Sequence, residues 1–302
     1  MKQKLPNFLI VGAAKSGTSS LHNYLNQHPE VFMPSYNREG MKVKEPRFLI
    51  KDLVQHRLHN GVWSWEEYKA LFNDVKDECS IGESTVLYLY YYKHAIDNIK
   101  KYLGKNIKII IMLRNPTERA YSAFQHVSRG LQEQYSFEEA LMLEEGRMDK
   151  DPSLTPMVMY KEMGLYYNMV TAYKENFSNV HVIFYEDFRD NTELEIKKIF
   201  KFLGISISAN IDFTRRYNVG GKRWKIQVMK NIFLKDYHLK TALKKIFPES
   251  FRKVIIDILI AISTAKVVGM KEKTRLKLNI FFKDDVRKLS ALLNRDLTNW
   301  IK

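Results

Sequence analysis

The chain carries a short segment, GAAKSGTSS at residues 12–20, in which glycine, lysine and hydroxyl side chains are concentrated. It follows an apolar run that predicts a buried strand at residues 8–12. A strand that enters a glycine-rich turn and then a helix exposes several backbone N–H groups, and the helix dipole adds positive charge there. Lys15 adds a full charge to this turn. The segment therefore predicts an anion-binding loop, whose contacts would come from Lys15, Ser16, Gly17, Thr18 and Ser19.

A second group of this kind follows the run IKIIIML at residues 107–113, whose branched side chains are typical of a central parallel strand. The strand ends in Arg114, and Asn115-Pro116 then predicts the start of a helix that carries Ser122. In open α/β sheets, ligands bind outside the carboxyl ends of the strands. A guanidinium at a strand end and a hydroxyl on the next helix predict a second clamp for a phosphate.

The elements that must position these residues alternate along the chain. Extended segments are predicted near residues 30–34, 80–84 and 180–186 in addition to the two strands above, and helices near 18–27, 91–103, 164–176 and 192–203. This alternation predicts an α/β fold, a P-loop-like, doubly wound parallel sheet flanked by helices. From about Trp224 the chain is lysine-rich and mainly helical in pattern. We expect one domain over residues 1–302, with about 225–302 as a helical extension.

Composition limits the class of partner and the compartment. The net charge of +15 indicates acidic partners such as phosphates, sulfates, nucleic acid or an anionic membrane surface. Cys79 is the only cysteine, which excludes an intrachain disulfide and a multi-cysteine metal site and favours the cytoplasm. The longest apolar stretch, at residues 254–262, is too short to span a bilayer. The sequence predicts a cytoplasmic protein without a transmembrane segment.

Two functions other than a transferase reaction are compatible with anion-binding segments of this kind, and each has its own sequence signature. A P-loop small-molecule kinase would carry G-x-x-x-x-G-K-[ST], with the lysine after the second glycine, whereas Lys15 lies two residues before Gly17. A non-enzymatic basic protein that binds anions or nucleic acid is suggested by the lysine-rich segment 222–253. That segment has no recognised nucleic-acid-binding signature, and its lysines alternate with apolar residues as on amphipathic helices. We therefore expect no nucleic-acid partner.

The motifs K-S-G-T-S at residues 15–19 and R-N-P-T-E-R-A-Y-S at 114–122 resemble those of sulfotransferases that use PAPS, 3′-phosphoadenosine 5′-phosphosulfate. The resemblance implies that the first loop binds the 5′ side of PAPS and that Arg114 and Ser122 bind its 3′-phosphate. The segment YNVGGKRW at 217–224 resembles the family's loop that closes over the nucleotide, with contacts from Gly221, Lys222 and Arg223. The ending LSALLNRDLTNW, at 289–300, resembles bacterial and heparan-type members.

The same resemblance implies in-line sulfuryl transfer, without a metal, to a hydroxyl or amine acceptor, with a carbohydrate favoured and PAP as the product. Such a transfer needs a base for the acceptor proton and a cation for the departing phosphate. Lys15 suits the second role. In MKVKEPRFL, at residues 41–49, Glu45 followed by Phe48 resembles the heparan-type glutamate that serves as the base.

The chain also departs from the heparan-type pattern. Members of that group often carry E-K-[ST]-P-x-Y before the second motif, but here the segment GESTVLY places Ser84 at the lysine position and Val86 at the proline position. Glu83 is retained and is a second candidate for the base. His94 and His126 are the histidines that remain open for this role.

Overall fold

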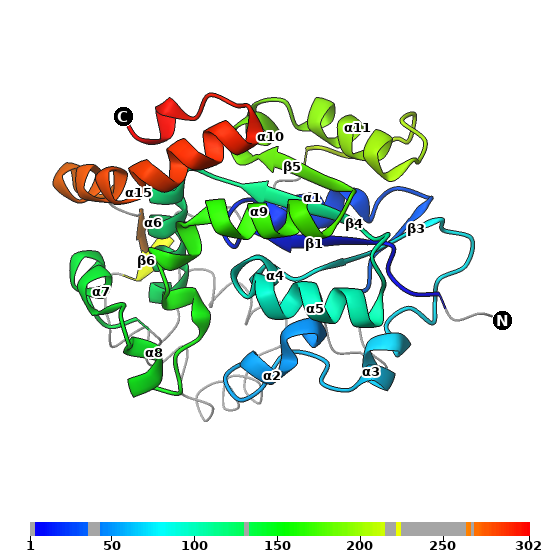
Figure 1. Cartoon of the computed structure of the whole chain (residues 1–302), viewed down its shortest axis with the longest axis horizontal. Helices are drawn as coiled ribbons and strands as arrows, with labels where there is room; N and C mark the ends of the chain where they lie inside the picture. Colours follow the sequence, from blue (N-terminus) through cyan, green and yellow to red (C-terminus); the bar gives the residue numbers. More distant parts are fainter. Residues whose placement is uncertain (1–3, 36–42, 130–132, 215–221, 225–263, 267–268) are drawn as a thin grey trace, which may run out of the picture.

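A five-stranded parallel sheet forms the centre of the molecule, with strand order β2-β3-β1-β4-β5 (Figure 1). The computed structural model describes residues 4–35, 43–129, 133–214, 222–224, 264–266 and 269–302. The strands are β1 (Phe8–Gly12), β2 (Val31–Phe32), β3 (Ser80–Ser84), β4 (Lys108–Leu113) and β5 (Val180–Phe184). This order puts the strand before the glycine-rich loop directly beside the strand that ends at Arg114. The predicted doubly wound parallel sheet is confirmed.

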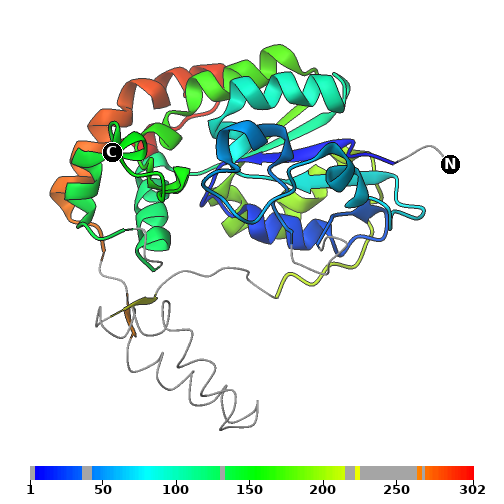
Figure 2. The same cartoon turned by 90° about the horizontal axis from the view of Figure 1, so that it is seen from below.

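Alternating side chains of the central strands divide the core into two layers. Leu9 and Val11 of β1 belong to one apolar cluster, and Phe8 and Ile10 to the other, because successive strand residues point to opposite faces. The first cluster is covered by α4 (Leu87–Tyr90), α5 (Tyr92–Tyr102) and α9 (Tyr166–Asn176). The second is covered by α1 (Thr18–Leu25), α10 (Tyr185–Asp190) and α11 (Thr192–Leu203). Figure 2 shows these two helical layers on opposite sides of the sheet.

The remaining described elements lie in the long connections and at the end of the chain. Between β2 and β3 are η1 (Phe48–Ile50), α2 (Lys51–Val54) and α3 (Trp65–Ala70). Between β4 and β5, in addition to α9, are α6 (Pro116–Arg129), α7 (Phe137–Leu143), α8 (Arg147–Lys150), η2 (Pro156–Val158) and η3 (Glu162–Gly164). The chain ends with α15 (Glu272–Leu293) and η4 (Thr298–Trp300). Helix α15 lies alongside α6 and α9 (Figure 1).

The C-terminal part is helical over α15, as expected, and it also contains a short strand. Residues Thr264–Lys266 form β7, which pairs antiparallel with β6 (Lys222–Trp224). The sequence pattern did not indicate this short strand, because pairing with a distant segment leaves no local signal. The intervening residues 225–263 lie outside the described ranges. Among the residues described, no helix has the length and apolar character needed to cross a membrane.

Gly82 in β3 provides a test of this packing. A Cβ atom at this position would lie 2.1 Å from Cζ of Phe8 and 2.5 Å from Sδ of Met33. Both neighbours are buried, so Gly82→Ala must displace core side chains, and we expect the free energy of unfolding to fall by about 1–3 kcal/mol. Urea denaturation measures the change.

Gly269→Ala is the matched control, because a Cβ atom there meets nothing within 4 Å. Its free energy of unfolding should stay within about 0.5 kcal/mol of wild type. Equal losses in the two variants would contradict the close contact between β3, β1 and Met33.

Candidate functional site

The two predicted anion clamps meet at the carboxyl ends of β1 and β4. The backbone N–H of Ala13 donates to the carbonyl of Met112 at 2.6 Å, which extends the pairing of the two strands into the loop. One nitrogen of the Arg114 guanidinium donates to the carbonyl oxygen of Lys15 at 3.2 Å. Residues that lie 99 positions apart in the sequence therefore form one site.

The glycine-rich loop depends on a close backbone approach at Gly17. This residue precedes α1 with φ of 96°, in the left-handed region, and provides no side-chain cap for the helix. A Cβ atom at Gly17 would lie 3.0 Å from Cε of Met112 and 3.1 Å from the Tyr185 ring. Thr18 begins the helix and is buried. The first N–H groups of α1 thus face the loop without a capping side chain, which is the arrangement that favours an anion.

Arg114 is held by neighbours from two other segments. Its guanidinium lies over the Tyr185 ring, 4.7 Å from the ring centroid. Its carbonyl oxygen accepts a hydrogen bond from the Tyr166 hydroxyl at 3.1 Å. These contacts fix the guanidinium at the strand end. The sequence analysis did not include Tyr185. This residue directly follows β5, which pairs with β4, so its position after a neighbouring strand was the signal that could have indicated it.

The predicted start of α6 is also confirmed. The side-chain oxygen of Asn115 accepts hydrogen bonds from the N–H groups of Thr117 at 3.0 Å and Glu118 at 3.3 Å. Pro116 is the first helical residue, where a missing N–H leaves no bond unmade. Ser122 is partly buried on this helix, about 9 Å along its axis from Pro116 at the usual rise per residue.

Positive charge gathers around Lys15. Burial lowers the pKa of Lys15 from 10.5 to about 8, and repulsion from nearby cations acts in the same direction, from Arg129, Arg114 and Lys44 in that order. Glu45 acts in the opposite direction. Glu45 thus opposes the repulsion among Lys15 and these three cations, and an anion in the loop would relieve that repulsion further. Sequence reasoning did not include Arg129, which lies at the end of α6.

Glu45 acts electrostatically on both this cluster and the buried carboxylate of β3. Its carboxylate is 3.6 Å from the Lys44 ammonium and 3.7 Å from the Arg47 guanidinium, and its side chain is 19% exposed. Its charge affects both Lys15 and Glu83. The predicted base is therefore within electrostatic reach of the predicted anion loop.

Glu83, the second candidate for the base, is completely buried. Its two carboxylate oxygens accept hydrogen bonds from the hydroxyls of Tyr68 at 2.6 Å and Thr85 at 2.7 Å. Burial raises its pKa to about 7, although these hydrogen bonds act in the opposite direction. Because both oxygens are already occupied inside the core, Glu83 is poorly placed to contact an acceptor.

The histidine candidates differ in position. His126 lies on α6 one turn after Ser122, and the loss of surrounding water, with the charges of Lys15 and Arg129, lowers its pKa to about 4. It is therefore neutral at physiological pH and a weak base. His94 is exposed on α5.

The loop predicted to close over the nucleotide lies mostly outside the description. Gly221 is not among the described residues, and Lys222 and Arg223 are described only as backbone of β6. Their predicted contacts stay predictions.

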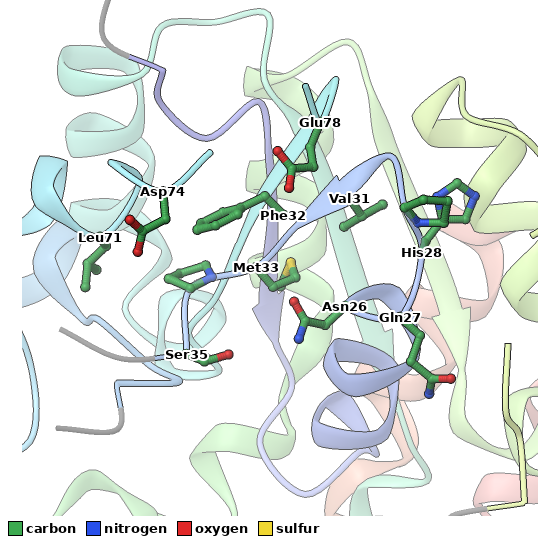
Figure 3. A pocket seen from close by; sticks show the side chains of 12 residues that line it. Asn26, Gln27, His28, Val31, Phe32, Met33, Ser35, Leu71, Asp74 and Glu78 are labelled. Atoms are coloured by element: carbon green, nitrogen blue, oxygen red, sulfur yellow. The ribbon is translucent and has the colours of Figure 1, made fainter. Parts of the chain in front are cut away.

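A cavity of about 440 Å³ opens beside the edge strand β2. It is lined by residues 26–29 and 31–35 and by Leu71, Asp74 and Glu78. Figure 3 shows Phe32, Asp74 and Glu78 toward one end of this cavity and His28 toward the other. None of the lining residues belongs to the predicted anion site. The cavity is thus separate from the loop at the end of β1.

The lowered pKa of Lys15 makes a prediction for stability. Between pH 8 and 10.5 the folded protein binds fewer protons at Lys15 than the unfolded chain, so stability increases with pH across this window. Below it, the folded state must hold a charged lysine among other cations. We expect wild type to gain free energy of unfolding relative to Lys15→Met as the pH rises from about 8 to about 10. Urea denaturation of both proteins measures the difference, and a difference that is constant with pH would contradict the lowered pKa of Lys15.

Comparisons with known proteins identify the family of the chain. The model of the sulfotransferase domain family matches residues 5–254. Mouse carbohydrate sulfotransferase 15 is 26% identical over 251 residues, which cover 67% of this chain and 44% of that protein. Human bifunctional heparan sulfate N-deacetylase/N-sulfotransferase 2 is 28% identical over 127 residues, which cover 41% of this chain and 13% of that protein. The chain thus spans less than half the length of these relatives.

A solved structure supports the same conclusion over nearly the whole chain. The crystal structure of a sulfotransferase from Alicyclobacillus acidocaldarius has a TM-score of 0.73 and 28% sequence identity, and the match covers 99% of this chain and 100% of that one. The fold and the family model point the same way. The chain belongs to the sulfotransferase family.

Proposed function

We propose that the protein transfers a sulfuryl group from PAPS to a hydroxyl or amine acceptor, with a carbohydrate as the favoured class. The observation that carries this proposal is the hydrogen bond from the Arg114 guanidinium to the Lys15 carbonyl. It joins two anion-binding elements that suit a ligand with negative charge at two separate points. PAPS has that charge distribution, with a 3′-phosphate and a 5′-phosphosulfate.

The donor set of the site fits such a ligand. Lys15 and the uncapped N-terminus of α1 would bind the 5′ side, with Ser16, Gly17, Thr18 and Ser19 around it. Arg114 presents a planar fork, and Ser122 a hydroxyl, to the 3′-phosphate. Repulsion among the cations around Lys15, which Glu45 opposes, would be relieved by the bound anion. Gly221, Lys222 and Arg223 would close over the nucleotide.

Two residues would carry the chemistry. The bound nucleotide supplies a sulfuryl group on a phosphate leaving group. Glu45 would accept the proton of the acceptor hydroxyl or amine while the acceptor atom forms its bond to sulfur. Lys15 would stabilise the electron pair that stays on the phosphate oxygen when the sulfur–oxygen bond breaks. We favour Glu45 over Glu83 because Glu45 is partly exposed and near Lys15, whereas both Glu83 oxygens are bonded inside the core.

The proposal extends to the class of acceptor and to the compartment. Relatives named as carbohydrate and heparan sulfate sulfotransferases favour a carbohydrate acceptor, and a net charge of +15 suits an acidic one. A cytoplasmic location, suggested by the single cysteine, stays a prediction.

Isothermal titration with PAP, the product nucleotide, tests the donor and the clamp together. We expect wild type to bind PAP more tightly than ATP with magnesium, since the position of Lys15 does not match a kinase loop. Arg114→Ala should lower the affinity for PAP by roughly 10- to 100-fold, because a hydrogen bond to a charged group contributes about 1.5–3 kcal/mol. The affinity for adenosine 5′-phosphosulfate, which has no 3′-phosphate, should fall much less in the same variant.

Arg189→Ala is the control, because that exposed arginine pairs only with its neighbour Asp190 among the contacts described. It should bind PAP as wild type does. Preference for ATP with magnesium would favour the kinase, and equal losses of the two nucleotides in Arg114→Ala would reject the 3′-phosphate clamp.

The base assignment has its own test. Glu45→Gln keeps the shape of the side chain but removes its capacity to accept a proton, and we expect turnover to fall by roughly 10²- to 10⁴-fold. The affinity for PAP should change little. Sulfuryl transfer from labelled PAPS measures turnover across a panel of acceptors. Glu66→Gln, at an exposed position on α3, is the matched control, and full activity in Glu45→Gln would move the role to Glu83 or His126.

A further inference from the structure

Lys44 reaches from the segment before η1 onto the first turn of α1. Its ammonium donates a hydrogen bond to the Ser19 hydroxyl at 2.9 Å, across 25 positions of sequence. The side chain is only 22% exposed. A lysine normally extends into water because its ammonium is strongly hydrated. Here it is directed instead at the helix end where the anion-binding loop lies.

This placement adds positive charge to a site that is already positive. Lys44 adds to the repulsion that helps to lower the pKa of Lys15, and the N-terminus of α1 is itself positive. The nearest carboxylate, that of Glu45, is 3.6 Å away and is shared with Arg47 at 3.7 Å. An ammonium beside a second ammonium and a positive helix end is stabilised by an anion between them. The arrangement therefore serves ligand binding better than it serves folding.

Lys44 also lies close both to the loop proposed to bind the donor and to the base proposed to act on the acceptor. It contacts Ser19 of the loop on one side and approaches Glu45, the proposed base, on the other. In an in-line transfer, the migrating sulfuryl group lies between the leaving phosphate and the acceptor atom. A cation between the loop and the base is thus beside the sulfuryl oxygens rather than at the 3′ end.

We propose that Lys44, oriented by Ser19, is a second cation for the 5′-phosphosulfate end of the donor and contacts the sulfuryl oxygens alongside Lys15. This inference rests on the proposed function. Lys44 accepts and donates no proton in this role. It balances the negative charge of the oxygens on sulfur while Lys15 balances the charge on the departing phosphate.

Isothermal titration of wild type and Lys44→Met with three nucleotides tests the inference without turnover. We expect Lys44→Met to lower the affinity for PAPS about 10-fold or more, since a hydrogen bond to a charged group contributes about 1.5–3 kcal/mol. The affinity for PAP, which has no sulfuryl group, should fall less, and the affinity for adenosine 3′-phosphate should stay the same. Lys51→Met is the matched control, because the Lys51 ammonium lies 5.3 Å from the centroid of the Phe48 ring and is not directed at the loop. It should bind all three nucleotides as wild type does.

Thermal unfolding of the ligand-free proteins separates a binding role from a structural one. If Lys44 serves the ligand, Lys44→Met should melt at the same temperature as wild type or higher, because repulsion with Lys15 is removed. A lower melting temperature together with equal weakening of all three nucleotides would overturn the inference, and so would unchanged PAPS affinity. Failure of wild type to bind PAPS or PAP would instead reject the proposed donor, and the role of Lys44 with it.

Discussion

Unbalanced positive charge at the carboxyl end of β1 is the constraint on which the site depends. Burial, together with repulsion from the nearby Arg129, Arg114 and Lys44, lowers the pKa of Lys15 to about 8. Folding alone would not favour bringing these groups together, since each adds repulsion. The surrounding structure holds them in place by neutral contacts. The Tyr185 ring lies against Arg114, and the Ser19 hydroxyl accepts from Lys44.

The core provides the rigidity that this repulsion requires. The carboxylate of Glu83 accepts from the Thr85 hydroxyl, and the Thr85 oxygen in turn accepts from the backbone N–H of Arg47 at 3.2 Å. Arg47 has φ of 61°, a left-handed conformation that a non-glycine residue adopts at a modest energetic disadvantage. The buried acid of β3 thereby fixes the turn that follows Glu45. Glu83 is thus better understood as support for the proposed base than as the base itself.

How much the sequence predicted depends on the range of the interactions involved. The parallel sheet was predictable because fully buried strands appear as continuous branched runs, such as residues 107–113, and because Asn115-Pro116 marks a helix start by local chemistry alone. The adjacency of the two clamps followed from the rule that ligands lie at the carboxyl ends of strands. The Lys44 contact with Ser19 could not be predicted, because a hydrogen bond across 25 positions leaves no periodic signal. The pairing of β7 with β6 was missed for the same reason.

The C-terminal helix takes part in the site through a chain of hydrogen bonds. Asp285 of α15 accepts from the backbone N–H of Tyr166 at 2.8 Å, at the start of α9, where a carboxylate also complements the helix dipole. The Tyr166 hydroxyl donates to the carbonyl oxygen of Arg114. The Arg114 guanidinium in turn donates to the carbonyl oxygen of Lys15. A displacement of α15 would therefore reach the anion loop through three directed bonds. We infer that α15 forms one structural unit with the sheet. The hydrogen bonds between Asp285 and Tyr166 and between Tyr166 and Arg114 connect this helix to the end of β4.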